Sequence, residues 1–218
     1  MEEAEAKDWL EQQQRVSRET IERLQVLTRL VFDENRRQNL VSRGTLDAMW
    51  SRHIVDSAQL LRFAPSPGCS WLDLGTGAGF PGLVVAIAHE GPVTLVEERR
   101  KRADFLVRAA AELGISHKVE LIWAKAERIE PRPFDVISAR AFAPLNRLLA
   151  ISHSFSTAKT RWILPKGRSA QSEVDAALAS WQGEFRLEPS LTDEDARIIV
   201  AEGVAPRKNG RGSGGGRR

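Results

Sequence analysis

A strand, a glycine-rich turn and a helix follow one another directly in the first half of this chain. The segment Trp71-Leu72-Asp73-Leu74 is typical of a buried strand, and a helix is predicted to begin near Pro81. Between them runs the sequence Asp73-Leu74-Gly75-Thr76-Gly77-Ala78-Gly79-Phe80-Pro81-Gly82. A carboxylate and several glycines at a strand-to-helix turn favour a cofactor site, because glycines let a ligand approach the backbone closely.

The glycine spacing indicates which cofactor. A dinucleotide site of the G-x-G-x-x-G type would need glycine at position 80, where this chain has Phe80. Asp73 followed by Gly75, Gly77 and Gly79 instead resembles motif I of the S-adenosylmethionine-dependent methyltransferases. The next predicted strand ends at Glu97, about 20 residues after the glycines, where a carboxylate can accept both ribose hydroxyls. The alternative is an ordinary tight turn followed by a surface acid.

Strands and helices alternate through the rest of the chain. Alternating strands and helices favour a doubly wound, mostly parallel sheet, whereas the last two strands lack a helix between them and predict an antiparallel hairpin. The expected fold class is therefore α/β with a seven-stranded sheet, and this arrangement resembles that of the Rossmann-like class I methyltransferases. Strands are predicted near 70–75, 93–98, 119–124, 134–139, 160–165, 185–190 and 196–202, and helices near 81–89, 99–113, 144–153 and 169–182.

An N-terminal helical extension precedes this alternation. Apolar residues at helical spacing predict an amphipathic helix over 18–36, and a weaker pattern predicts another over 3–15. Thr45 is the expected cap of a further helix that runs to about Phe63. We therefore expect a helical extension over 1–66, a methyltransferase domain over 67–204 and a basic tail over 205–218.

Composition narrows the class of protein. The tail from Arg207 to Arg218 holds five basic residues and no acid, and its glycine-rich composition predicts disorder. Such an arm would either add non-specific affinity for phosphates or serve only solubility. No apolar run is long enough to span a membrane, and the acidic N-terminus is unlike a signal peptide, so we expect a cytoplasmic protein. The single Cys69 and four scattered histidines predict no metal site.

Several further segments carry a more specific resemblance. They stand in the order and at the spacing found in the bacterial small-subunit rRNA guanine-N7 methyltransferases, also called glucose-inhibited division protein B. The resemblance covers roughly residues 20–202. Its segments are Asn39-Leu40, Arg52-His53-Ile54-Val55-Asp56-Ser57, Gly79-Phe80-Pro81-Gly82, Lys101-Arg102-Ala103-Asp104-Phe105-Leu106, Ser138-Ala139-Arg140-Ala141-Phe142-Ala143-Pro144-Leu145 and Leu164-Pro165-Lys166-Gly167.

This resemblance implies an activity and a set of site residues. The implied cofactor is S-adenosyl-L-methionine, and its contacts fall on Gly75, Phe80, Ala126, Glu127 and Arg140. The implied partner is 16S rRNA or the 30S subunit, with methylation of N7 at a guanine of the 530 loop, guanine 527 in the family. Guanine N7 has a free lone pair and no proton, so we expect no catalytic base.

Few residues are candidates for positioning the target guanine. Arg140 and Lys166 are expected near the pocket rim, whereas core packing is the favoured interpretation of Phe142.

The run Arg99-Arg100-Lys101-Arg102 opens a helix, where cations are unfavourable unless an anion compensates them. RNA, or the neighbouring acids, could be that anion; a solvated face is the default interpretation.

Two other functions are compatible with these patterns. A methyltransferase of the same fold could act on a small molecule or a protein, and would bind the cofactor without modifying RNA. A non-catalytic RNA-binding protein could retain a vestigial pocket, although the intact run from Asp73 to Gly79 counts against it. Nothing in the sequence demands more than a monomer.

Overall fold

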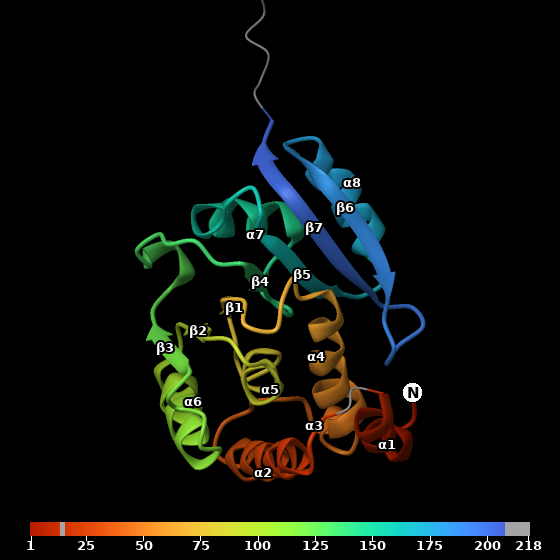
Figure 1. Ribbon diagram of the computed structural model, residues 1–218, viewed down its shortest axis with the longest axis vertical. Helices are drawn as coiled ribbons and strands as arrows, with labels where there is room; N and C mark the ends of the chain where they lie inside the picture. The colour runs from red at the N-terminus through yellow and green to blue at the C-terminus, as the bar shows by residue number, and fades with distance from the viewer. Residues whose placement is uncertain (14–15, 208–218) are drawn as a thin grey trace, which may run out of the picture.

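A single seven-stranded sheet organises the computed structural model, which describes residues 1–13 and 16–207. The strand order is β3-β2-β1-β4-β5-β7-β6 (Figure 1). The first five strands pair in parallel, and β7 pairs antiparallel with both β5 and β6. This confirms the predicted α/β class and the C-terminal hairpin. The strands are β1 (Trp71–Leu74), β2 (Val93–Glu97), β3 (Val119–Trp123), β4 (Val136–Ser138), β5 (Arg161–Lys166), β6 (Trp181–Pro189) and β7 (Arg197–Pro206).

The last strand lies inside the sheet rather than at its edge. β7 runs between β5 and β6, so that Ile163 pairs with Val200 on one side and Arg186 pairs with Val200 on the other. The strand extends to Pro206, which corrects the expected start of the tail at residue 205. Arg207 is also fixed, since its N–H donates to the Ser180 carbonyl (2.8 Å). The rest of the predicted tail, 208–218, lies outside the described residues.

Helices cover both faces of the sheet and create two apolar cores. On one face Val93 and Leu95 pack against α5 and α6; on the other Leu72 and Leu164 pack against α7 and α8. Adjacent residues of one strand thus point to opposite cores, as the pleat requires. In the described part of the chain, no helix is both long and apolar enough to cross a membrane. These helices are α5 (Gly82–Ala88), α6 (Arg100–Glu112), α7 (Leu145–Ser152) and α8 (Ala170–Leu178).

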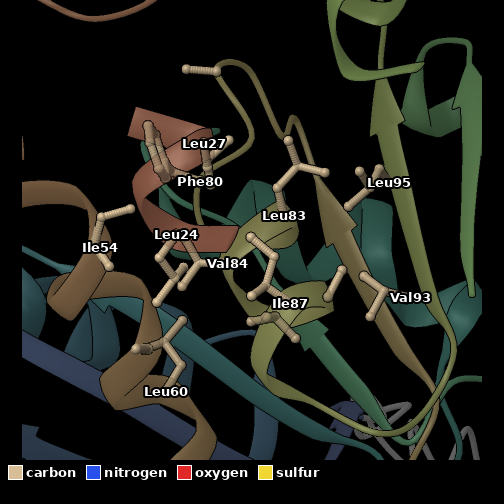
Figure 2. Packing of buried hydrophobic residues seen from close by; sticks show 14 of the residues in the cluster. Leu24, Leu27, Ile54, Leu60, Phe80, Leu83, Val84, Ile87, Val93 and Leu95 are labelled. Carbon is tan, nitrogen blue, oxygen red and sulfur yellow. The ribbon is translucent and has the colours of Figure 1, made fainter. Parts of the chain in front are cut away.

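The N-terminal helices share the core of the α5 face. Leu24 and Leu27 of α2 (Arg18–Asn35) lie against Phe80 and Val84, as Figure 2 shows. The second predicted helix, over 3–15, is found as α1 (Glu3–Gln13). Because one continuous core joins these helices to the sheet, the extension packs as part of the same body; its limit at residue 66 stays a prediction.

The helix predicted from Thr45 to Phe63 is interrupted at Asp47 and Ala48, and after this break it continues without a gap to Phe63. Its pieces are α3 (Arg43–Leu46), a π-helical turn (Trp50–Val55), α4 (Asp56–Ala58) and a 3₁₀ turn (Gln59–Phe63). Ser42, not Thr45, occupies the N-cap position. The break has a physical cause, because the Glu3 carboxylate accepts from the N–H groups of Trp50 and Ser51 (2.7 and 2.8 Å) and so starts a new helical run there.

Candidate functional site

The glycine turn after β1 leaves one face of its backbone open. Gly77 has φ +62°, and a Cβ added there would meet only Arg102 Nη1 and the Gly75 carbonyl, both at 3.7 Å. Gly75 has φ +68°, and a Cβ there would lie 2.5 Å from Cδ2 of Phe142. Both glycines thus adopt a conformation that other residues rarely take. The turn presents bare backbone toward the loop that follows β4.

Asp73 lies behind the turn and shapes it. Its side chain is fully buried, with Oδ1 accepting from the Ser138 hydroxyl (2.6 Å) and Oδ2 from the Gly82 N–H (3.0 Å). One carboxylate therefore joins β1, β4 and the start of α5. A cofactor contact by Asp73 stays a prediction, whereas its contacts within the protein make it the residue that fixes the turn.

Burial raises the pKa of Asp73 to about 6, against hydrogen bonds from Ser138, Thr76 and Gly82 that lower it. Between pH 4 and pH 6 the folded protein therefore holds a proton that the unfolded chain has released, and stability contributed by this group falls as pH rises. Asp73→Asn removes the titration. We expect the free energy of unfolding of the wild type, relative to Asp73→Asn, to fall by about 2 kcal/mol between pH 4 and pH 6.5. Urea unfolding of both proteins across this range measures it; parallel pH profiles would contradict it.

Glu97, at the end of β2, is directed at the same turn. The side chain is 4% exposed, and Oε2 accepts from the Gly77 N–H (2.9 Å) while Oε1 accepts from the Arg99 N–H (2.8 Å). A carboxylate oxygen can accept more than one hydrogen bond, so each oxygen retains capacity for a hydroxyl. Glu97 thus meets the geometric requirement for a ribose ligand while it also holds the glycine turn.

A cavity of about 430 Å³ collects four of the predicted cofactor residues. Gly75 and Glu97 line it from the ends of β1 and β2, and Ala126 and Glu127 line it from the short helix after β3. The carboxyl ends of parallel strands meet at this edge, as in other open α/β sheets. Four residues predicted to contact the cofactor thus line one cavity from three separate strand ends, and their contact with a cofactor stays a prediction.

A larger cavity of about 820 Å³ adjoins the first one. Arg140 and Lys166 line it, together with His53 and Asp56 from the N-terminal extension. The two cavities share the wall formed by residues 141–143. Phe142 of this wall packs against the core of the α7 and α8 face, as expected, and it also packs onto Gly75 between the two cavities.

Arg140 fastens the extension to the sheet edge. Its Nη1 donates to the Arg52 carbonyl and to Asp56 Oδ2 (both 3.2 Å), and its Nη2 lies 3.0 Å from His53 Nδ1. Phe80 is buried beneath, with its ring stacked on His53 at 4.9 Å and 5.3 Å from the Arg140 guanidinium carbon. The predicted contacts of Phe80 and Arg140 with the cofactor stay predictions; both side chains are engaged in this cluster.

His53 is the residue of this cluster that sequence reasoning undervalued. A guanidinium can only donate, so Nδ1 of His53 accepts and the ring is neutral. Burial, followed by the charge of Arg140, lowers the pKa of His53 to about 3. His53 and Asp56 are three residues apart in a predicted helix. This spacing was the available signal that the two side chains share one helix face.

Lys166 holds the other side of the larger cavity. Its Nζ donates to Glu173 Oε2 (2.8 Å) and to the Ala143 carbonyl (3.0 Å), and its side chain is 13% exposed. Glu173 also accepts from the Leu145 N–H (2.8 Å), which ties α8 to the start of α7. Lys166 therefore supports the loop that carries Phe142. Across residues 1–13 and 16–207, no cluster of three or more acidic, histidine or cysteine side chains could hold a metal ion.

Comparison with known proteins decides the family. The profile of the family described as rRNA small subunit methyltransferase G (GidB) matches residues 20–193. The chain belongs to this family. It is 52% identical to the ribosomal RNA small subunit methyltransferase G of Rhizorhabdus wittichii, over 96% of this chain and 97% of that protein. It is 46% identical to the protein of the same name from Zymomonas mobilis, over 92% and 93% of the two chains.

Solved structures confirm the fold at low sequence identity. An O-methyltransferase from Bacillus cereus in complex with SAH has a TM-score of 0.57 and 16% identity, covering 81% of this chain and 90% of its own. The Bacillus subtilis M1A22 tRNA methyltransferase TrmK has a TM-score of 0.55 and 14% identity, covering 67% and 64%. The protein is thus a methyltransferase of the rRNA small subunit methyltransferase G family with a Rossmann-like fold.

Substitution of Glu97 tests directly whether the smaller cavity binds the cofactor. We expect Glu97→Ala to weaken S-adenosylmethionine binding by roughly 10- to 100-fold, because hydrogen bonds to charged groups contribute about 1.5–3 kcal/mol. Glu97→Gln, which keeps the shape, should bind with intermediate affinity. Isothermal titration calorimetry measures the affinity, with Glu112→Ala on the exposed end of α6 as the control. Unchanged affinity of Glu97→Ala would assign the ribose to another group.

Proposed function

We propose that this protein transfers the methyl group of S-adenosyl-L-methionine to N7 of a guanine in the 530 loop of 16S rRNA, guanine 527 by resemblance to the family. The observation that carries the proposal is the pair of adjoining cavities. One is lined by the glycine turn and Glu97, and the other by Arg140 and Lys166, with Phe142 in the shared wall. A methyl donor and an acceptor base need two such neighbouring sites.

The smaller cavity has the features that the cofactor requires. Glu97 offers hydrogen-bond acceptors for the ribose, and Gly75 of the glycine turn lines the same cavity for the methionine end. Ala126 is buried at the floor of the short helix after β3, where its backbone can contact the adenine. When bound, S-adenosylmethionine supplies an activated methyl group on a sulfonium centre.

The larger cavity suits an unpaired purine. Its volume of about 820 Å³ lies within the range of small-ligand sites, and its wall offers donors from Arg52, Arg140 and Lys166, each of which is paired with an acid of the same wall. Sequence-specific RNA recognition mostly involves bases that are splayed out of the helix and bonded along their edges. A donor such as Arg140 or Lys166 fits guanine O6, which accepts hydrogen bonds beside N7.

The protein's contribution to the reaction is positioning. The lone pair of N7 forms the new bond to carbon while the sulfur–methyl bond breaks and its electron pair stays on sulfur. Positive charge moves from sulfur to the purine, and no proton has to leave. Holding the two reactants in line supplies roughly 7–11 kcal/mol of barrier reduction. No residue need act as a base, and Arg140 and Lys166 serve to orient the loop and the base.

Transfer to defined RNA tests the proposal. Labelled methyl groups from S-adenosylmethionine would be offered to 30S subunits and to free 16S rRNA from a strain that lacks this modification. Strand cleavage specific for N7-methylguanosine then maps the product. We expect label at one guanine of the 530 loop. If neither RNA is labelled while cofactor binding is intact, the result would favour a small-molecule or protein acceptor. An rRNA acceptor would also place the protein in the cytoplasm, and we propose that it acts as a monomer.

A further inference from the structure

The most exposed large apolar side chain in the described residues is that of Trp123. It is 56% exposed and ends β3, the edge strand of the sheet (Figure 1). The residues that follow it, Ala124 to Glu127, line the smaller cavity. A large aromatic side chain therefore stands in solvent at the same sheet edge as the cofactor site, where packing gives it no role.

The indole ring is held in place although it is exposed. Its Nε1 donates to the Glu98 carbonyl (3.0 Å), and the guanidinium carbon of Arg100 lies 5.2 Å from the ring centroid. The hydrogen bond fixes the plane of the ring, and the guanidinium covers it as a cation–π pair. A ring that is already fixed loses little conformational freedom when another planar group stacks on it.

Other basic residues lie close to Trp123 and Arg100 in the sequence. Arg99, Arg100, Lys101 and Arg102 open α6 with no acid in its first turn, although cations are unfavourable at a helix N-terminus. Glu97 accepts from the Arg99 N–H at the helix start, Glu98 lines the smaller cavity and Asp104 lies 4.0 Å from Arg100, so these acids offset only part of the charge of the basic run and of Lys125. Lys125 and Arg102 line the smaller cavity, together with Ala124, which follows Trp123. The arrangement presents an aromatic plane within positive charge, which complements a base and its phosphates.

We propose that Trp123 and Arg100 form a stacking platform for an unpaired nucleotide of the RNA substrate, at the β3 end of the smaller cavity and away from the larger cavity that takes the guanine. Phosphates of that strand lie against Arg99 and Lys125. A protein partner is less well matched, because its interface would need a larger apolar patch than one indole among cations. This inference rests on the proposed function in that the bound partner is RNA.

Binding experiments separate this platform from the reaction itself. The proteins are wild type, Trp123→Ala, Trp123→Phe and the control Val107→Ala, whose side chain is 55% exposed on α6, two turns beyond Arg100. Affinity for unmethylated 30S subunits and 16S rRNA is measured by filter binding, affinity for S-adenosylmethionine by calorimetry, and stability by thermal unfolding.

We expect Trp123→Ala to weaken RNA binding roughly 5- to 100-fold, as alanine substitution of a stacking residue does, with cofactor affinity and stability unchanged. Trp123→Phe should stay within about threefold of the wild type, since it retains an aromatic plane. Val107→Ala should bind as the wild type does.

Two results would overturn the inference. One is wild-type RNA affinity in Trp123→Ala, and the other is an equal loss in Val107→Ala. A different result would overturn the proposed function: the wild type would transfer no methyl group to any guanine N7. That result does not depend on how Trp123→Ala changes RNA binding. A wild type that binds neither RNA would overturn both.

Discussion

Replacing Gly82 with alanine should destabilise the protein by roughly 3 kcal/mol or more and weaken its binding of S-adenosylmethionine. A Cβ at this position would overlap Cδ2 of Leu95 and come within 2.7 Å of Asp73 Oδ2. Overpacking a core costs about 1–3 kcal/mol, and disturbing the carboxylate that accepts from the Gly82 N–H adds a comparable amount. Since Asp73 fixes the glycine turn, the cofactor site is distorted together with the core.

Gly44→Ala is the matched control for this substitution. Gly44 lies in α3, and a Cβ there would meet nothing within 4 Å. Alanine at such a position should be neutral or stabilise by up to about 1 kcal/mol through the unfolded chain. Urea unfolding and calorimetric titration of both variants give the comparison. If Gly82→Ala unfolded at the same urea concentration as Gly44→Ala, α5 would have room to move away from β1 and β2.

Replacing Arg140 with alanine should lower methyl transfer by at least about 100-fold, because small displacements of a positioning loop have effects of that size. The substitution removes the donors that reach Asp56, His53 and the Arg52 carbonyl. Loss of hydrogen bonds to the partly buried Asp56 carboxylate should also cost about 2 kcal/mol of stability. Initial rates with 30S subunits and urea unfolding measure the two effects.

Arg140→Lys distinguishes charge from geometry. Lysine keeps the charge, but it cannot present a planar fork to the groups that Arg140 joins. We expect Arg140→Lys to remain at least tenfold below the wild type in transfer, with most of the stability restored. Arg132→Ala, which removes an exposed arginine paired with Glu120, serves as the control. A fully active Arg140→Lys would mean that positive charge alone is required in the larger cavity.

Sequence reasoning worked best where one local pattern determines one element. The strands that end at Glu97 and Trp123 are short apolar runs bounded by turn residues, and each was placed within a few residues of its observed limits. The family resemblance named Ala126 and Glu127, which follow a predicted strand end, and both line the same cavity as Glu97. None of these inferences needed a contact between distant parts of the chain.

Sequence reasoning failed where a contact between distant residues decides the local structure. The helix expected from Thr45 breaks because Glu3, more than 40 residues away, takes the N–H groups of Trp50 and Ser51. In the site, His53 reaches Arg140 only because the extension folds back over the sheet edge. The position of Phe142 between two cavities likewise depends on how one loop packs onto Gly75. Periodicity and motif spacing carry no information on such contacts.

The interior position of β7 has a consequence for how the protein is made. Because β6 is joined to the sheet only through β7, β6 cannot dock until the last strand has been synthesised. A chain that stops before Arg197 would leave the β5 edge without its partner, and unpaired edges of this kind promote aggregation. Closure of the sheet is thus a late step of biosynthesis that joins distant parts of the chain. Truncation of the C-terminus is therefore expected to lower the solubility of the protein even before its activity can be measured.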